Sequence, residues 1–332
     1  MSAPSGLVIV DKPGGMTSHD VVARIRRMAG TRRVGHAGTL DPMATGVLVI
    51  GVERATRLLG YLALTEKQYA ATIRLGQSTS TDDAEGEVTV TGSAAGVCPA
   101  ALTDAGLAEA MASLTGEIQQ VPPAISAIKV AGQRAYRLTR AGTAPELAAR
   151  SVRVHEFAVT AVDHVGDMLD VDATVRCSSG TYIRALARDL GAALGTGGHL
   201  TRLRRTRVGG YGIDSARTLD ELAELFEVVP LAQAASVFPR RDLSADEARR
   251  LAHGGRLAAA TAVGPVGAAA LASSAASAGT ASAGTAADTA ASLGLSAPEG
   301  AAGPTAAYAP DGALIALVTE ESGQARPLVV FA

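Results

Sequence analysis

Cysteine is nearly absent from this sequence, and no apolar run is long. The two cysteines, Cys98 and Cys177, form neither a metal-ligand spacing nor a disulfide framework. No apolar stretch approaches the roughly 20 residues that cross a bilayer, and the N-terminus lacks a charged-then-apolar export signal. These absences exclude membrane insertion and predict a reduced, cytoplasmic protein.

Nucleotide and metal signatures are missing as well. The sequence contains no P-loop and no G-x-G-x-x-G fingerprint, which argues against ATP or a hydride carrier. Its six histidines show neither H-E-x-x-H nor a CxxC partner. We therefore expect no cofactor and no metal.

Charge is balanced over the whole chain but segregated along it. The formal net charge of -2, from 30 basic and 32 acidic residues, does not by itself indicate an RNA partner. Two stretches are nevertheless cationic, namely Met1–Gly60 and Arg176–Val208, and their arginines are Arg24, Arg26, Arg27, Arg32, Arg33, Arg54, Arg57, Arg176, Arg184, Arg188, Arg202, Arg204, Arg205 and Arg207. If the two stretches meet in the fold, they form a phosphate-binding surface. The alternative is that these arginines lie on ordinary solvated faces.

Strand and helix patterns are mixed without regular beta-alpha-beta alternation. The expected strands are Leu7–Val10, Val47–Val52, Lys67–Leu75 and Leu169–Cys177. The expected helices are one capped by Ser18 and closed by Gly30, one capped by Thr103, and one that follows Ser179. Thr31–Thr45 is expected to be a loop. The pattern predicts an α+β domain around a large, mostly antiparallel sheet flanked by helices.

The composition changes near Pro239, which indicates a boundary before a smaller module. There we expect one amphipathic helix within Leu243–Leu257 that ends at Gly254 and Gly255, and two strands, Ala313–Val318 and Pro327–Phe331. Between them, 259–306 is rich in Ala, Gly, Ser and Thr, so it buries too little apolar surface to offset its ordering entropy. We expect a disordered insertion, with an alanine-rich helix as the alternative.

One acidic residue stands in an unusual stretch, Gly35-His36-Ala37-Gly38-Thr39-Leu40-Asp41-Pro42-Met43-Ala44-Thr45-Gly46. Glycines and a proline around one histidine and one aspartate describe a tightly turned loop, a common place for reactive side chains on a rigid scaffold. Taken alone, Asp41 before a proline is more often a simple turn residue.

The stretch resembles the catalytic motif of TruB-family pseudouridine synthases, and further motifs match in order. They are Lys12-Pro13 with Thr17-Ser18, Lys67-Gln68-Tyr69, Thr81-Asp82-Asp83-Ala84-Glu85-Gly86, Gln120-Val121-Pro122-Pro123, and Ser179-Gly180-Thr181-Tyr182-Ile183-Arg184. The resemblance covers about Gly6 to Tyr211. It implies isomerisation of a uridine, at position 55 in the T-loop of tRNA, with Asp41 as the catalytic carboxylate.

The same resemblance assigns the remaining site residues. Arg184 matches the arginine that pairs with the catalytic carboxylate, with a phosphate contact as the alternative. Tyr69 matches the tyrosine that stacks on the target base, and the resemblance also gives it a part in removing the proton from C5. Strand alternation alone is equally consistent with Tyr69 as a core residue. Tyr182 would line the same pocket, and His36 would help hold RNA with the base extruded.

Lys12 and Asp83 have family counterparts near the active site and are expected to support it. The family pattern divides the chain into a catalytic domain, 1–238, with a thumb-like insertion at about 122–153, and a small PUA-like β module, 239–332, which contains the expected insertion 259–306. The implied partner is the tRNA T-arm stem-loop, with no DNA or membrane partner, and we expect a monomer.

Two alternatives to this assignment differ in class. A guide-RNA-dependent synthase of the dyskerin type shares the aspartate loop, but its relatives are shorter after the Pro-Pro motif, which favours a stand-alone enzyme here. The other alternative is an RNA-binding module or tRNA-folding chaperone in which Asp41 is structural.

Overall fold

The computed structural model describes residues 3–91, 99, 102–124, 129–130, 133–134, 147–259 and 303–332. Most of the two predicted insertions, about 122–153 and 259–306, lies outside the described residues, as does Cys98. Among the residues described, no helix is long and apolar enough to cross a membrane.

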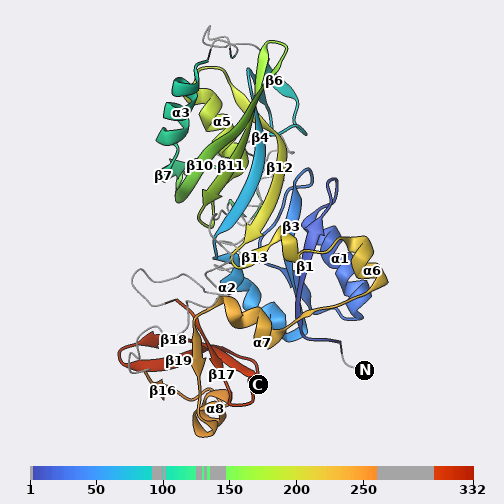
Figure 1. Cartoon of the computed structure of the whole chain (residues 1–332), viewed down its shortest axis with the longest axis vertical. Coiled ribbons are helices and arrows are strands. Elements are labelled where there is room, and N and C mark those ends of the chain that lie inside the picture. The colour runs from blue at the N-terminus through green and yellow to red at the C-terminus, as the bar shows by residue number, and fades with distance from the viewer. Residues whose placement is uncertain are drawn as a thin grey trace.

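A ten-stranded sheet forms the centre of the larger unit (Figure 1). Its strands are, in spatial order, β14 (Val229–Pro230), β1 (Gly6–Lys12), β3 (Thr45–Val52), β12 (Gly198–Val208), β4 (Lys67–Leu75), β11 (Met168–Cys177), β10 (Arg150–Val165) and β7 (Gly116–Gln120), with β13 (Tyr211–Gly212) on β12 and β2 (Val34–His36) on β3. All these pairings are antiparallel except that of β3 with β12. The predicted mixed, mostly antiparallel sheet is confirmed.

Four helices contribute to one continuous core with this sheet. They are α1 (Ser18–Ala29), α3 (Asp104–Ser113), α5 (Ile183–Ala193) and α6 (Leu219–Glu224). The strand β4 places Tyr69, Ala71, Ile73 and Leu75 in this core, as its period-two pattern predicts. The small hairpin of β5 (Gln77–Thr79) and β6 (Val88–Thr91) follows β4.

The strands β1 and β3 are buried on both faces, which explains their nearly unbroken apolar sequences. Val8 and Val10 join the first core, whereas Leu7 and Ile9 face a second one. The second core contains residues of η1 (Glu53–Leu58), α2 (Leu59–Ala63), α7 (Leu231–Ala234) and η4 (Ala235–Val237), together with residues of the C-terminal sheet.

A five-stranded sheet lies at the other end of the molecule from β6 (Figure 1). Its order is β15 (Arg240–Asp242), β17 (Thr305–Tyr308), β18 (Leu314–Glu321), β19 (Gln324–Val330) and β16 (Leu257–Ala258), and α8 (Ala245–Ala252) packs on it. Arg54 Nη1 donates to Phe331 O at 2.7 Å, and Arg57 Nη1 donates to Val330 O at 2.6 Å. Two arginines of the first cationic stretch therefore join this sheet to the larger unit.

Two predictions at the ends of helices are wrong. Thr17, not Ser18, caps α1, because Thr17 and Asp20 form a reciprocal capping box. The helix predicted from Leu243 begins later, since Ser244 caps α8 and its first residue is Ala245. Its predicted end at Gly254 and Gly255 is confirmed, because α8 ends at Ala252 and Gly254 adopts a left-handed φ of 78°.

Three loop boundaries also differ from the expectation. The predicted loop Thr31–Thr45 contains the short strand β2, which pairs with β3. The strand β10 begins at Arg150, so the last residues of the predicted thumb belong to the sheet. The strand β17 begins at Thr305, inside the predicted insertion.

Candidate active site

The loop between β2 and β3 carries Asp41, and its backbone conformation depends on glycine. Gly38 and Gly46 have φ values of 104° and 98°, a region that side-chain-bearing residues rarely adopt. A Cβ atom on Gly46 would lie 2.2 Å from Arg205 O. The sequence motif therefore needs glycine at position 46 both for its backbone angle and for the close approach of β12.

Side chains from β1 and α1 fix the middle of this loop. The Ser18 hydroxyl donates to Leu40 O at 3.1 Å and accepts from Leu40 N at 2.8 Å. The fully buried Lys12 Nζ donates to Pro13 O, Met16 O and Pro42 O at 2.8, 2.6 and 3.2 Å. The Asp41 backbone is thus held on both of its sides.

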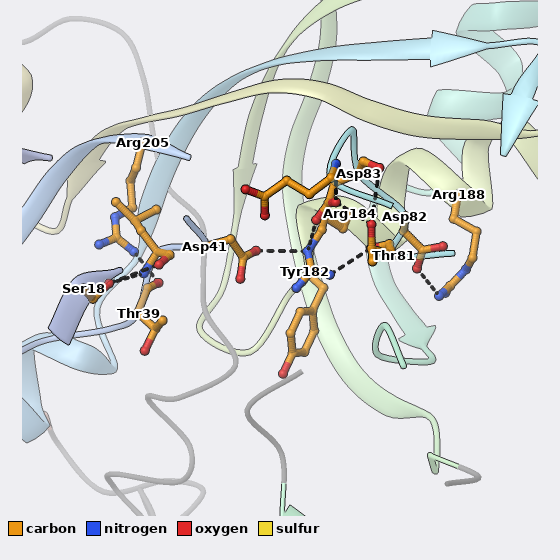
Figure 2. Close-up of polar contacts among 12 residues, drawn as sticks. Ser18, Thr39, Asp41, Thr81, Asp82, Asp83, Tyr182, Arg184, Arg188 and Arg205 are labelled. Atoms are coloured by element: carbon orange, nitrogen blue, oxygen red, sulfur yellow. Dashed lines mark hydrogen bonds and ion pairs between the residues drawn. The ribbon is translucent and has the colours of Figure 1, made fainter. Parts of the chain in front are cut away.

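Asp41 faces an arginine that is almost completely buried. Arg184 Nε lies 3.0 Å from Asp41 Oδ2 and 3.4 Å from Asp83 Oδ2 (Figure 2). The Arg184 side chain is 5% exposed and that of Asp83 is 4% exposed, whereas the Asp41 side chain is 35% exposed. The acid of the motif is therefore the member of this cluster that a solute can reach.

Two structural elements hold Arg184 and Asp83 in place. Arg184 lies in the first turn of α5, after the N-cap residue Tyr182, and its Nη1 donates to Thr81 O at 2.8 Å. Asp83 Oδ1 accepts from Glu85 N at 3.1 Å and from the Thr81 hydroxyl. Because these contacts are to backbone or to a short side chain, the pair is fixed before any substrate arrives.

The cluster changes the proton affinity of the groups around it. Burial alone would lower the pKa of the Arg184 guanidinium, but the carboxylates of Asp41 and Asp83 outweigh it and raise that pKa. Burial lowers the pKa of Lys12 to about 8, against the opposing attraction of Asp41. Burial, followed by the charges of Asp83 and Asp41, raises the pKa of Glu85.

The two tyrosines of the predicted site occupy different environments. Tyr69 is 4% exposed and belongs to the core beneath the loop. Burial raises the pKa of Tyr69, although the neighbouring Arg205, which is also hydrogen-bonded to it, acts in the opposite direction. Because its pKa is raised, Tyr69 is a neutral phenol at neutral pH. Tyr182, by contrast, is only half-buried, and Figure 2 shows its ring below Arg184.

His36 lies in β2 and packs edge-on against His19 of α1, with ring centroids 5.7 Å apart. Burial, the charge of His19 and the charge of Arg205 lower the pKa of His36 to about 4. The ring is consequently neutral at physiological pH. Among the residues described, no group of three or more His, Cys, Asp and Glu side chains is arranged to hold a metal ion.

Arg205 is a site residue that the sequence analysis missed, since we counted it among the arginines of a phosphate-binding run. It is fully buried, and its guanidinium donates to the carbonyl oxygens of Val47, Thr39 and Gly38 at 2.7, 3.3 and 3.2 Å. The sequence signal was its place in β12 two residues after Leu203, which predicts the same inward face.

Most other arginines of that run are also engaged within the protein. Arg188 pairs with Asp82 and Asp189 at 3.0 and 2.8 Å, and Arg204 pairs with Asp11 at 2.6 Å. The contact of Arg204 with Asp11 brings the two cationic stretches together, as the sequence suggested. The second stretch nevertheless contributes less free positive charge than its composition indicates.

A cavity of about 510 Å³ adjoins the site. Met43 and Thr45 from the Asp41 loop and Glu85 from the loop of Asp83 line one side of it. Ala84 and residues of β4, β10, β11 and β12 form the rest. Asp41, Arg184 and Tyr182 are not among its lining residues, so the cavity adjoins the ion pair without containing it.

Three family models match the chain in succession. They are TruB family pseudouridylate synthase (N terminal domain) over residues 26–183, tRNA pseudouridylate synthase B C-terminal domain over 184–234, and tRNA Pseudouridine synthase II, C terminal, over 238–275 and 283–332. The N-terminal model spans the whole Asp41 loop and reaches the residue before Arg184.

Curated relatives are similar over nearly the full length. A protein of Arthrobacter sp. (strain FB24) named tRNA pseudouridine synthase B is 56% identical, over 99% of this chain and 97% of its own. One of Thermobifida fusca (strain YX) with the same name is 57% identical, over 98% of each. A solved chain from an H/ACA RNP bound to a substrate RNA containing 2'-deoxyuridine has a TM-score of 0.65 at 23% identity, over 98% of this chain and 85% of that one. At that identity it shows a shared fold.

Proposed function

The chain belongs to the TruB family of pseudouridine synthases, and on this premise we propose that it isomerises a uridine in the T-loop of tRNA, at position 55, with Asp41 as the catalytic carboxylate. It is an isomerase that acts on uridine in tRNA. What we propose is which loop of the tRNA the enzyme modifies and which of its residues carry out the reaction.

The reaction needs no atom from outside the nucleotide. The bond between N1 of uracil and C1′ of ribose breaks, the base turns, and a bond forms between C5 and C1′. C5 loses a proton and N1 gains one, so there is no net oxidation and no transferred group. We propose on this balance that no cofactor takes part.

The ion pair of Asp41 with Arg184 is the observation that carries the proposal. Its 3.0 Å contact fixes the Asp41 carboxylate against a buried guanidinium, and the 35% exposure leaves that carboxylate open to an everted nucleoside. Loop tethers from Ser18 and Lys12 hold the acid in one orientation, which lowers the entropic cost of reaching the transition state. An anion fixed this way can act as a nucleophile.

The neighbouring residues suit an extruded base. Aromatic stacking contributes about 1–3 kcal/mol per base. We propose that the half-buried Tyr182 supplies it, and that Tyr69, which is 4% exposed here, does so once RNA binding uncovers its ring. Asp83 supports the arginine from behind, and Lys12 supports the loop. His36, neutral and packed on His19, can help hold RNA with the base extruded without carrying charge.

The identity of the RNA partner rests on the relatives. Those that match this chain over nearly their whole length are named for tRNA, whereas the solved chains from H/ACA particles share about 23% identity. We therefore favour a stand-alone, monomeric enzyme that binds the T-arm stem-loop over a guide-RNA-dependent one.

The test is direct. Purified protein is mixed with an unmodified tRNA transcript and, separately, with its T-arm stem-loop, and pseudouridine is located by mass spectrometry after chemical tagging. We expect one product at T-loop position 55 with both RNAs and no added cofactor. Asp41→Asn should lower the rate by about 10⁴-fold or more while tRNA affinity stays within a few-fold.

The matched control is Asp220→Asn, which changes an exposed carboxylate in α6 and should leave the rate unchanged. An inactive wild-type protein that binds tRNA tightly would favour the binding-module alternative. A large loss of affinity in Asp41→Asn would mean that Asp41 mainly supports the fold.

A further inference from the structure

Arg205 contacts the Asp41 loop at both of its ends. Its guanidinium reaches the carbonyl oxygens of Gly38 and Thr39, before Asp41, and its Nε reaches Val47 O, after it. Figure 2 shows Arg205 with Thr39 and Ser18 on one side of Asp41, and Arg184 with Asp83 on the other. Two buried arginines thus flank one partly exposed acid.

The two arginines differ in what surrounds them. Arg184 has two carboxylates within 3.4 Å. Within the described part of the chain, Arg205 has no carboxylate within 4.0 Å, although it is 0% exposed. A buried cation without an anionic partner is costly unless its donors are well used. Here backbone carbonyls and the Tyr69 side chain use them.

We propose that Arg205 is a positioning residue for the isomerisation, one that clamps the Asp41 loop and Tyr69 in a single arrangement. The inference rests on the function proposed above and adds to it a residue that does not touch the RNA. A planar guanidinium can hold three carbonyl groups at fixed angles, which a lysine ammonium on a flexible stem cannot do. Small displacements of a reacting group of about 1 Å cost roughly 100-fold in rate.

The fixed charge of Arg205 also reaches titratable groups on three nearby strands. It acts on Lys12 of β1, His36 of β2, and Lys67 and Tyr69 of β4. On the two lysines and His36 it adds to burial in favouring the neutral form. His36 therefore serves as an internal reporter of whether a variant at position 205 keeps the charge.

The experiment compares Arg205→Lys and Arg205→Gln with wild type. We measure kcat and KM on the tRNA transcript, the salt dependence of tRNA binding, and the His36 titration by NMR. The NMR signal is assigned with His36→Gln. For Arg205→Gln we expect kcat to fall about 100-fold. Its tRNA affinity and salt slope should stay within twofold of wild type, because the buried side chain meets no phosphate.

Arg205→Lys separates the clamp from the charge, and it serves as the main variant if Arg205→Gln does not fold. Its kcat should still fall at least tenfold, since one ammonium cannot span Gly38, Thr39 and Val47. The His36 pKa should stay at about 4 in this variant, because the lysine keeps the positive charge, and it should rise in Arg205→Gln, which removes that charge. The control is Arg74→Gln, which removes an arginine paired with Asp170 on the same sheet and should keep kcat near wild type.

Three results would overturn the inference. One is wild-type kcat in Arg205→Lys, because charge alone would then suffice. Another is a weaker tRNA affinity with a lower salt slope and unchanged kcat, because Arg205 would then contact phosphate. The third is an equal loss of kcat in Arg74→Gln. An inactive wild-type protein would instead refute the proposed function, so the two failures are distinguishable.

Discussion

The two arginine-rich stretches of the chain look alike in sequence and differ in the fold. In α1 and the turn after it, Arg24, Arg27 and Arg32 are exposed, and within the described residues none has an acidic side chain within 4.0 Å. In α5 and β12, by contrast, Arg184 and Arg205 are buried, and Arg188 and Arg204 are paired with acids. We call the first set the outer arginines and the second set the inner arginines.

The difference shows that arginine content does not measure RNA-binding charge. The inner arginines form ion pairs with Asp11, Asp41 and Asp82 and donate hydrogen bonds to backbone carbonyls, so they stabilise the site and the strands around it. The outer arginines remain available to phosphates. Substitutions in the two sets should therefore change different observables. The rate should depend on Arg184 and Arg205, which contact Asp41 or its loop, and the affinity on the outer set.

The largest expected effect is on the inner side. Arg184→Ala should lower the single-turnover rate by about 10²–10³-fold, because it leaves Asp41 and the buried Asp83 without their shared cation. Arg188→Gln, one turn later in α5, is the matched control and should lose less than tenfold. Equal losses in both variants would mean that α5 as a whole, rather than the pair, carries the effect.

Acid should destabilise the fold through His36, whose pKa is lowered mainly by burial and further by the charges of His19 and Arg205. Its folded pKa of about 4 lies below the ordinary value of 6.5, so between these values the unfolded chain binds a proton that the folded chain does not. Stability should therefore rise with pH across this window and decrease as pH falls through it, by up to about 3 kcal/mol. Urea unfolding of wild type and His36→Gln at pH 7 and pH 4.5 measures this, and an identical pH dependence in both proteins would contradict it.

The outer set should change affinity. Substitution of Arg24, Arg27 and Arg32 by Gln together should weaken tRNA binding by about tenfold at moderate salt. Each lost phosphate contact should reduce the slope of log K against log salt by about 0.7–0.9. Titrations at several salt concentrations test this, with saturating kcat unchanged. Arg204→Gln, whose partner is Asp11, is the control, and a slope that falls in the control alone would reverse the comparison.

The smallest effect concerns an arginine of the first stretch that is not free. Arg57→Gln should lower the free energy of unfolding by about 0.5–1 kcal/mol, because the hydrogen bond that its exposed guanidinium makes within the described residues is the one to Val330 O. Thermal unfolding of both variants measures this, and Arg27→Gln should lower the free energy of unfolding by less than Arg57→Gln does. The opposite order would show that Arg57 contributes nothing to holding the C-terminal sheet.

Periodicity and motif order predicted much of the fold. The strands β4 and β11 and the buried faces of both follow from alternation alone, because one face packs on helices. The end of α8 followed from Gly254 and Gly255, whereas its start did not, because Ser244 rather than Leu243 precedes the first helical turn and caps it. The cap of α1 failed for a similar reason, because Thr17 and Ser18 are both good caps and the hydroxyl of Ser18 is needed by Leu40.

The sequence by itself determined which residues meet around Asp41, because motifs in a fixed order resemble one family and Lys12, Asp83 and Arg184 belong to them. Only the tertiary structure decided what each arginine does. A guanidinium becomes a clamp, an ion-pair partner or a free cation according to the burial and the acceptors that distant segments bring to it. Arg205 and Arg202 are three residues apart in one strand, yet one is 0% exposed and the other has a side chain 76% exposed.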